Sequence, residues 1–98
     1  MSSYSYRLSR QAEQDLEDIW IYIAPQNQIA ADGQVAQILD RLPMLAQFPD
    51  MGKTRDDLIK GLRSFPIKPY MVFYSKTING IEIVRVLHQS RDIESLFS

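Results

Sequence analysis

The segment RVLHQSRDI, residues 85–93, holds the chain's only histidine between two arginines. Cleaving RNA through its 2′-hydroxyl needs a base for the hydroxyl proton, a cation for the pentacoordinate phosphate and an acid for the leaving oxygen. The side chains that could fill these roles are cationic or aromatic: Arg63, Lys68, Tyr70, Arg85, His88 and Arg91. By residue type alone, a nuclease site is therefore one interpretation.

The spacing of these residues argues against that site. Arg85 and His88 are an odd number of positions apart on a predicted strand, so they point to opposite faces unless a β-bulge intervenes. The face of Arg85 would also carry Ile81, Ile83 and Leu87, and that of His88 would carry Glu82, Val84 and Val86. We therefore predict no catalytic residue. His88 is predicted to be a structural hydrogen-bonding group, and Arg91 and Asp92 to form a local ion pair in a turn.

Length and composition set the class of protein. The 98 residues suffice for one domain, residues 1–98, with one hydrophobic core. With no cysteine and one histidine, neither a metal site nor a cofactor is expected. No apolar stretch approaches the roughly 20 residues of a membrane span, so we expect a soluble, cytoplasmic protein.

The charge is nearly balanced but unevenly distributed. The net charge of −1 argues against direct nucleic-acid binding, because such binding depends on many cations. Residues 1–49 hold three Lys or Arg against six Asp or Glu, and residues 50–98 hold eight against six. A modest basic face is therefore expected in the second half.

The first half of the chain predicts a strand and two helices. The alternation in YSYRL predicts a strand over residues 4–8, and Ser9 is the predicted cap of a helix that Pro25 ends. That helix carries an apolar stripe, in which Trp20 is predicted to be a core residue: Ala12, Leu16, Ile19, Trp20 and Ile23. A second helix is predicted over residues 28–48, with Pro43 expected to kink it or end it early. Its buried stripe comprises Val35, Ile38, Leu39, Leu42, Leu45 and Ala46.

The second half predicts strands. Residues 48–61 are rich in charged residues and in residues that interrupt helices and strands, so they are predicted to form an irregular segment. Strands follow at 62–68, where Pro66 indicates an edge or a bulge, and at 70–75. Asn79-Gly80 signals a hairpin into a central strand over residues 81–88. The last residues, 91–97, predict one docked helical turn through Ile93, Leu96 and Phe97.

The order β-α-α-β-β-β indicates a two-layer α+β fold, with a helical hairpin packed on one face of a mainly antiparallel sheet. No predicted element covers the other, apolar face of the sheet, which is therefore a predicted partner surface. Two interpretations stay open for Arg63 and Arg85: their guanidiniums reach carboxylates at the rim of the sheet, or they await an acidic partner. Tyr70 and Tyr74 share a face and form either core or an aromatic shelf for a partner.

Three segments in this order resemble ParE-type toxins of the RelE/ParE superfamily of bacterial toxin–antitoxin systems: DLEDIWIYI (15–23), GLRSFPI (61–67) and RVLHQSRDI (85–93). The loop FPDMGKTRDDL (48–58) is similar too, so the resemblance covers nearly the whole chain. It implies the β-α-α-β-β-β fold, a target in DNA gyrase that is bound without catalysis, and a ParD-like antitoxin. That antitoxin would bind by adding a strand at an exposed sheet edge or by laying a helix in a groove beside the two helices.

The same resemblance leaves two alternatives. RelE-type relatives cut messenger RNA on the ribosome, which here would use Arg63, Arg85, His88 and Arg91. Arg91 looks like an arginine of some RNase relatives, but the tyrosine or histidine that such relatives carry after it is missing. The chain could also be an inactive toxin kept as an antitoxin-binding module. The partner-binding candidates are Arg63, Phe65, Lys68, Tyr70, Tyr74, Arg85, His88 and Arg91.

Overall fold

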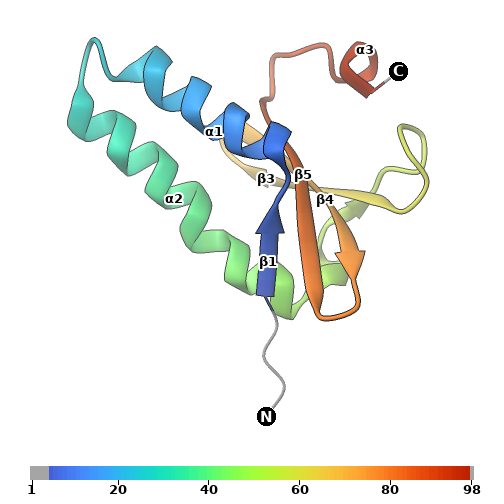
Figure 1. Cartoon of the computed structure of the whole chain (residues 1–98). Helices are drawn as coiled ribbons and strands as arrows, with labels where there is room; N and C mark the ends of the chain where they lie inside the picture. The colour runs from blue at the N-terminus through green and yellow to red at the C-terminus, as the bar shows by residue number, and fades with distance from the viewer. Residues whose placement is uncertain (1–4, 98) are drawn as a thin grey trace.

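The computed structural model describes residues 5–97 and has the predicted two-layer α+β architecture (Figure 1). Position 4, the predicted start of the first strand, lies outside the described residues. The elements are β1 (Ser5–Leu8), α1 (Arg10–Ile23), α2 (Gln28–Gln47), a 3₁₀ turn η1 (Pro49–Met51), β2 (Lys53–Thr54), β3 (Leu62–Ile67), β4 (Tyr70–Thr77), β5 (Gly80–His88) and α3 (Ile93–Phe97). None of the helices in this part of the chain has the length and hydrophobicity of a membrane span.

The sheet has five strands in the order β1-β5-β4-β3-β2. β1 runs parallel to β5, and the other neighbours are antiparallel. β5 therefore lies between two strands, as predicted. The turn residues between the paired Thr77 and Gly80 are Ile78 and Asn79, so the predicted hairpin is confirmed.

The helical hairpin of α1 and α2 packs on one face of the sheet (Figure 1). This core is formed by apolar side chains of both layers, among them Leu16, Ile19, Ile38, Leu42, Leu45, Val72, Ile81, Ile83 and Val86. Trp20 is not a core residue, contrary to the prediction. It is half-buried, and its indole nitrogen donates to the Asp32 carboxylate at 2.7 Å, which links α1 to α2. A tryptophan at the border of the apolar stripe can keep its polar edge near water.

Side-chain caps begin both long helices. The Ser9 hydroxyl accepts a hydrogen bond from the Ala12 amide at 3.0 Å, as predicted, and donates to the Val84 carbonyl at 2.9 Å. Asn27 caps α2 through the Ala30 amide. α2 continues through Pro43 to Gln47, so the early end expected there is wrong. Pro43 removes one hydrogen bond, whereas the fully buried Leu42, Leu45 and Ala46 hold the last turn against the core.

The second face of the sheet is covered, which corrects the prediction of a naked partner surface. Leu62, Phe73 and Leu87 are buried there, with at most 3% of the surface of each residue exposed. The cover comes from the segment after β2 and from α3, through Leu58, Ile93, Leu96 and Phe97. The Phe73 and Phe97 rings are 5.0 Å apart. The predicted docked turn at the end of the chain is thus part of a second, smaller core.

β2 is an additional strand inside the segment that was expected to be irregular. It is short, pairing Lys53 with Ser64 and Thr54 with Arg63. β3 is therefore not the last strand of the sheet, but its second half extends beyond the reach of β2. Pro66 lies in this second half, where a strand tolerates a residue without an amide donor.

Candidate functional site

A β-bulge in β5 decides where the candidate residues point. Phe73 pairs with Arg85 and Tyr74 with Ile83, so Val84 is an extra residue on β5. The bulge shifts the alternation of side chains by one position. Val84 and Leu87 consequently contact the second core, whereas Val86 and Ile83 belong to the core under the helices. The predicted grouping of faces assumed a regular strand and is wrong across the bulge: Leu87 does not share a face with Ile81 and Ile83, and Val86 does not share one with Val84.

Arg85 lies opposite Phe73 in the sheet and reaches Asp15 of α1. Its Nε and Nη2 atoms donate to the two carboxylate oxygens of Asp15 at 2.8 and 3.0 Å. The Asp15 side chain is 6% exposed and also accepts from the Val86 amide at 2.9 Å. The hydrogen bond to Asp15 raises the pKa of Arg85. Arg85 is thus a structural cation that joins helix and sheet.

Sequence reasoning missed Asp15, although a signal was present. Asp15 follows Ala12 by three positions and precedes Ile19 by four, which places it on the buried face of α1. An acid on the apolar face of a helix needs a buried partner, and Arg85 is that partner. The interpretation in which the arginine reaches a carboxylate within its own chain is the observed one.

Arg63 is engaged in the same way at the other end of the sheet. Its Nη1 donates to the Gly52 carbonyl at 2.7 Å, and its Nη2 is 3.3 Å from the Asp50 carboxylate. Lys76 also bonds to Asp50 at 2.8 Å, and that hydrogen bond lowers the pKa of the Asp50 carboxyl. Half of the eight cations in residues 50–98 take part in ion pairs described by the structure, so part of the predicted basic charge is neutralised within the chain.

Tyr70 and Tyr74 are core residues and do not form an exposed aromatic shelf. Tyr74 is fully buried; its hydroxyl donates to the Pro49 carbonyl at 2.7 Å and accepts from the Gly52 amide at 2.9 Å. Burial raises the pKa of both phenols. The Tyr70 ring meets the His88 ring edge-on, with centroids 5.4 Å apart.

His88 has the structural role that was predicted. Its Nδ1 accepts from the Ser90 amide at 3.1 Å and lies 2.8 Å from the Ser90 hydroxyl. A neutral ring in this geometry carries its proton on Nε2. The Arg91 amide donates to the His88 carbonyl at 3.0 Å, so the turn is centred on Gln89 and Ser90, just before the predicted position. The predicted ion pair between Arg91 and Asp92 is not among those of residues 5–97.

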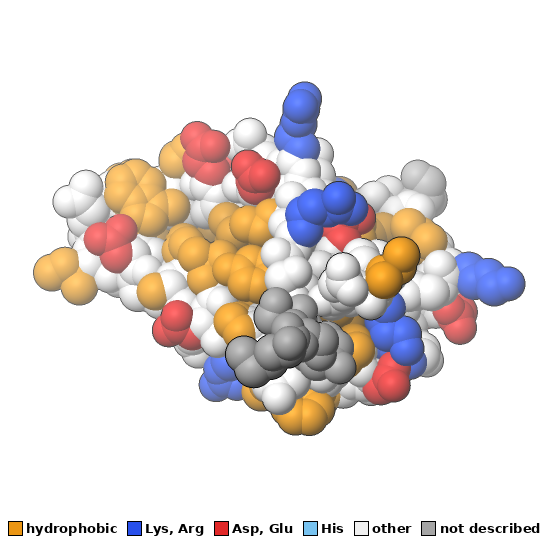
Figure 2. All heavy atoms as spheres, turned by 60° about the horizontal axis from the view of Figure 1, so that its bottom comes forward, with side chains coloured by type: hydrophobic (Ala, Val, Ile, Leu, Met, Phe, Trp, Pro, Cys, Tyr) orange, Lys and Arg blue, Asp and Glu red, His pale blue; other side chains and the backbone are white. Residues whose placement is uncertain are grey.

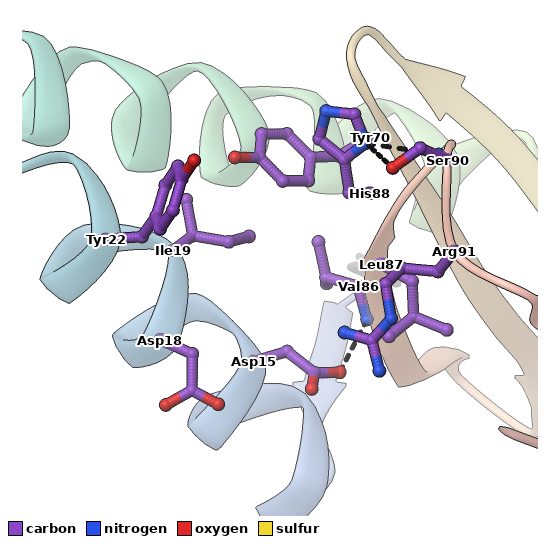
Figure 3. Close-up of a pocket in the computed structure, with 10 residues that line it drawn as sticks. All are labelled: Asp15, Asp18, Ile19, Tyr22, Tyr70, Val86, Leu87, His88, Ser90 and Arg91. Atoms are coloured by element: carbon purple, nitrogen blue, oxygen red, sulfur yellow. Dashed lines mark hydrogen bonds between the residues drawn. The ribbon is translucent and has the colours of Figure 1, made fainter.

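A pocket of about 440 Å³ opens between α1 and the end of β5 (Figure 3). α1 contributes Asp15, Asp18, Ile19 and Tyr22, and the sheet side contributes Tyr70, Val86, Leu87, His88, Ser90 and Arg91. Its walls combine apolar and aromatic side chains with polar and charged ones. Because Arg85 compensates Asp15, the remaining charges in the lining are the Asp18 carboxylate and the Arg91 guanidinium. This arrangement can hold a side chain or a ring between two opposite charges.

Some of the predicted site residues line the pocket, and the others lie elsewhere. Tyr70, His88 and Arg91 line it. The remaining candidates lie elsewhere: Arg63 and Tyr74 are bonded to the segment around η1, Arg85 to Asp15, Phe65 packs against the helix-facing core, and Lys68 is exposed. Within residues 5–97 no group of three or more histidine or acidic side chains is placed to hold a metal ion.

Comparison with known proteins identifies the family. A family described as "ParE toxin of type II toxin-antitoxin system, parDE" matches residues 6–93. The chain belongs to the ParE toxin family. The matched range contains all three segments on which the resemblance was based, so the resemblance is confirmed. As a ParE toxin of a type II system, the chain has an antitoxin as its partner.

Three curated relatives support this membership. Toxin ParE1 of Caulobacter vibrioides is 38% identical over 86 residues, covering 87% of this ParE toxin and 88% of the relative. Toxin ParE3 of the same organism is 31% identical over 80 residues, covering 81% and 80%. Toxin ParE1 of Mycobacterium tuberculosis is 30% identical over 94 residues, covering 94% and 96%.

A solved structure shows the same fold. A chain from "Chromosomal ParDE TA system from P. aeruginosa" superposes with a TM-score of 0.73, covering 87% of this ParE toxin and 95% of that chain at 23% identity. The two-layer α+β architecture predicted from the sequence is thus that of a ParDE component.

Proposed function

We propose that this ParE toxin acts by binding, without catalysis, in the cytoplasm. Its target is DNA gyrase, which it holds in a DNA-cleaved state, and a ParD-like antitoxin neutralises it. The observation that carries this proposal is the internal engagement of Arg85 by Asp15. Phosphate chemistry needs a cation that is available to the reacting phosphate, and the charge of Arg85 is already compensated by the buried Asp15 carboxylate.

The surface of the helical hairpin supports binding to another protein. Three large apolar side chains are exposed there: Ile21 at 52%, Tyr22 at 83% and Ile29 at 84%. Figure 2 shows hydrophobic side chains gathered in a band on the half of the molecule formed by the helices. Exposed apolar groups of this kind are typical of protein-interaction surfaces.

A supercoiling assay tests the proposal. Purified toxin at stoichiometric excess is added to gyrase and relaxed plasmid, and both supercoiling and trapped double-strand breaks are measured. We expect loss of supercoiling with accumulation of breaks, and recovery of supercoiling when the antitoxin is added first. Undiminished supercoiling without trapped breaks would refute the gyrase proposal.

One observation favours an alternative. Tyr70, His88 and Arg91 line one pocket, so a nucleotide between them would meet a cation, an aromatic wall and a histidine (Figure 3). Ribosome-dependent cleavage of messenger RNA would then be abolished by Arg91→Ala and retained by Lys60→Ala, an exposed cation outside the pocket. Absence of growth arrest when the toxin is induced alone would instead indicate an inactive antitoxin-binding module.

A further inference from the structure

The Tyr70 hydroxyl is a polar group that the fold leaves without a partner, in the wall of the pocket between α1 and the end of β5. Tyr70 is only 7% exposed, yet no group of residues 5–97 hydrogen-bonds to its hydroxyl. Figure 3 shows this hydroxyl pointing toward that of Tyr22 across the pocket. Polar groups of buried side chains usually have a hydrogen-bond partner, so a hydroxyl that opens into a pocket without one indicates a ligand.

The Arg91 guanidinium is the second group of this lining without a partner. Asp15 is compensated by Arg85, and Asp18 accepts a hydrogen bond from the Gln14 amide group at 2.9 Å. In the part of the chain that the structure describes, the Arg91 side chain forms neither an ion pair nor a hydrogen bond, and it extends from the turn after β5 toward α1 (Figure 3). The charge that remains available in the pocket is therefore positive, which favours an anionic ligand.

The donors of the lining favour a carboxylate over a phosphate. A guanidinium presents two parallel N–H groups that match the two oxygens of a carboxylate. A phosphate monoester carries more negative charge, and Arg91 is the one cation of the lining that could meet it. His88 does not add a second cation, because its Nδ1 accepts a hydrogen bond from the Ser90 amide, which leaves the ring neutral.

The rest of the pocket suits an aromatic ring. Ile19 and Val86 are buried, and they line the pocket together with the side chains of Tyr22 and Tyr70. A ring placed among them makes apolar contacts and the edge-to-face or offset contacts that aromatic side chains prefer. The pocket volume of about 440 Å³ lies in the range of roughly 300–1,000 Å³ that is usual for small-molecule sites. It is therefore large enough for one substituted ring.

We propose that this pocket binds a small aromatic carboxylate. The ring lies among Ile19, Tyr22, Tyr70 and Val86, a polar substituent of the ring hydrogen-bonds to the Tyr70 hydroxyl, and the carboxylate pairs with Arg91. The site does not depend on the proposed action on gyrase. Because Tyr22 also belongs to the exposed apolar surface of the helical hairpin, a bound ligand changes the surface that a partner protein meets.

A titration of the full chain with 4-hydroxyphenylacetate, followed by NMR chemical shifts, tests the site. We expect saturable shifts at Ile19, Val86 and Leu87, with a Kd below about 1 mM. The matched neutral compound is 4-hydroxyphenethyl alcohol, in which a hydroxymethyl group replaces the carboxylate. It should bind at least about tenfold more weakly, because hydrogen bonds to charged groups are stronger than those to neutral ones. Absence of saturable shifts at millimolar concentrations would overturn the proposal.

Two variants assign the contacts. Arg91→Gln should weaken the binding of 4-hydroxyphenylacetate about tenfold, whereas Arg41→Gln, which changes an exposed arginine of α2 outside the lining, should bind as wild type. Tyr70→Phe should weaken the same ligand about fivefold but leave the binding of phenylacetate, which lacks the ring hydroxyl, unchanged. Dispersed amide NMR spectra check that the variants are folded, as expected from the exposure of Arg91 and Arg41 and from the unpartnered hydroxyl of Tyr70 within residues 5–97.

Each contact has its own contradicting result. Unchanged binding of 4-hydroxyphenylacetate to Arg91→Gln would overturn the pairing of the carboxylate with this arginine. Equal weakening of 4-hydroxyphenylacetate and phenylacetate by Tyr70→Phe would overturn the hydrogen bond to the ring substituent.

Two further probes distinguish the proposed ligand from other occupants. Adenosine monophosphate tests the phosphate class, and an N-acetylated peptide ending in tyrosine carries the same ring and carboxylate at the end of a chain. We expect both to bind more weakly than 4-hydroxyphenylacetate. Tighter binding of the nucleotide would overturn the choice of a carboxylate, and tighter binding of the peptide would overturn the choice of a small molecule. None of these measurements involves gyrase or an antitoxin, so the outcomes leave the proposed function to its own assay.

Discussion

Replacing Asp15 with alanine should destabilise this ParE toxin by about 3–5 kcal/mol, the cost of breaking a buried ion pair by removing one partner. The change leaves the Arg85 guanidinium, only 17% exposed, without its carboxylate. It also leaves the buried Val86 amide without its acceptor, which costs about 1–3 kcal/mol within that total. Because Arg85 retains some access to water, the lower end of the range is expected. A domain of this size has about 5–15 kcal/mol of stability in all.

Urea denaturation followed by circular dichroism measures the effect in a graded series. Asp15→Asn keeps an oxygen that can accept from the Val86 amide but loses the charge, so a smaller loss of about 1.5–3 kcal/mol is expected. Replacing both partners, as Asp15→Leu with Arg85→Met, should recover most of the stability, since an apolar pair can substitute for a buried ion pair. The double-mutant cycle then gives the coupling between the two side chains.

The matched control is Asp18→Ala, which removes an acid three positions further along α1. Asp18 is exposed and accepts from Gln14 at its surface, so its loss should change stability by no more than about 0.5 kcal/mol. A loss below about 1 kcal/mol for Asp15→Ala would refute the assignment of Arg85 as a structural cation. Arg85 would then have to be reconsidered as a residue available to a target.

Four further substitutions test the packing. Tyr74→Phe should cost about 1–3 kcal/mol in urea denaturation, because the buried Gly52 amide loses its acceptor. Burial raises the pKa of Tyr74 above 10.0. The stability that the neutral Tyr74 contributes is therefore fully present below about pH 10 and is lost as the pH rises through the raised pKa, so the variant should show a smaller decline in stability in an alkaline titration. Ser9→Ala should cost about 1–2 kcal/mol of the free energy of unfolding through loss of the α1 cap. Gly80→Ala should abolish the β1–β5 pairing seen by NMR, because a Cβ would collide with the β1 backbone. Gly33→Ala, whose Cβ would lie in open space on α2, should stabilise the fold by up to about 1 kcal/mol and raise the thermal midpoint.

The long periodic elements were predictable because their signals are local. The helical spacing of Leu16 and Ile19 and the capping hydroxyl of Ser9 each act within a few residues of the chain, and the structure has them where expected. Asn79 and Gly80 likewise marked the hairpin. These features need no knowledge of what the segment packs against.

The features that the sequence did not predict depend on contacts between segments distant along the chain. β2 has two residues and exists because β3 lies beside it, so Lys53 and Thr54 carry no pattern of their own. The second core takes single apolar side chains, such as Leu58 and Phe97, from segments that are otherwise polar. The bulge at Val84 lies in a β-branched run with no local sign of an extra residue. The bulge puts Val86 in the core under the helices and Leu87 in the second core, a division that a regular strand would not give.

The parallel pairing of β1 with β5 constrains how the chain can fold as it is synthesised. Ser9 and Val84, which join these strands, are 75 residues apart, and a contact so distant in sequence forms only after a large entropic cost of loop closure. On the ribosome, β1 is translated before β5 and cannot form this pairing until β5 has been made. The complete sheet, and the toxin surface that it supports, can therefore form only after β5 has been translated.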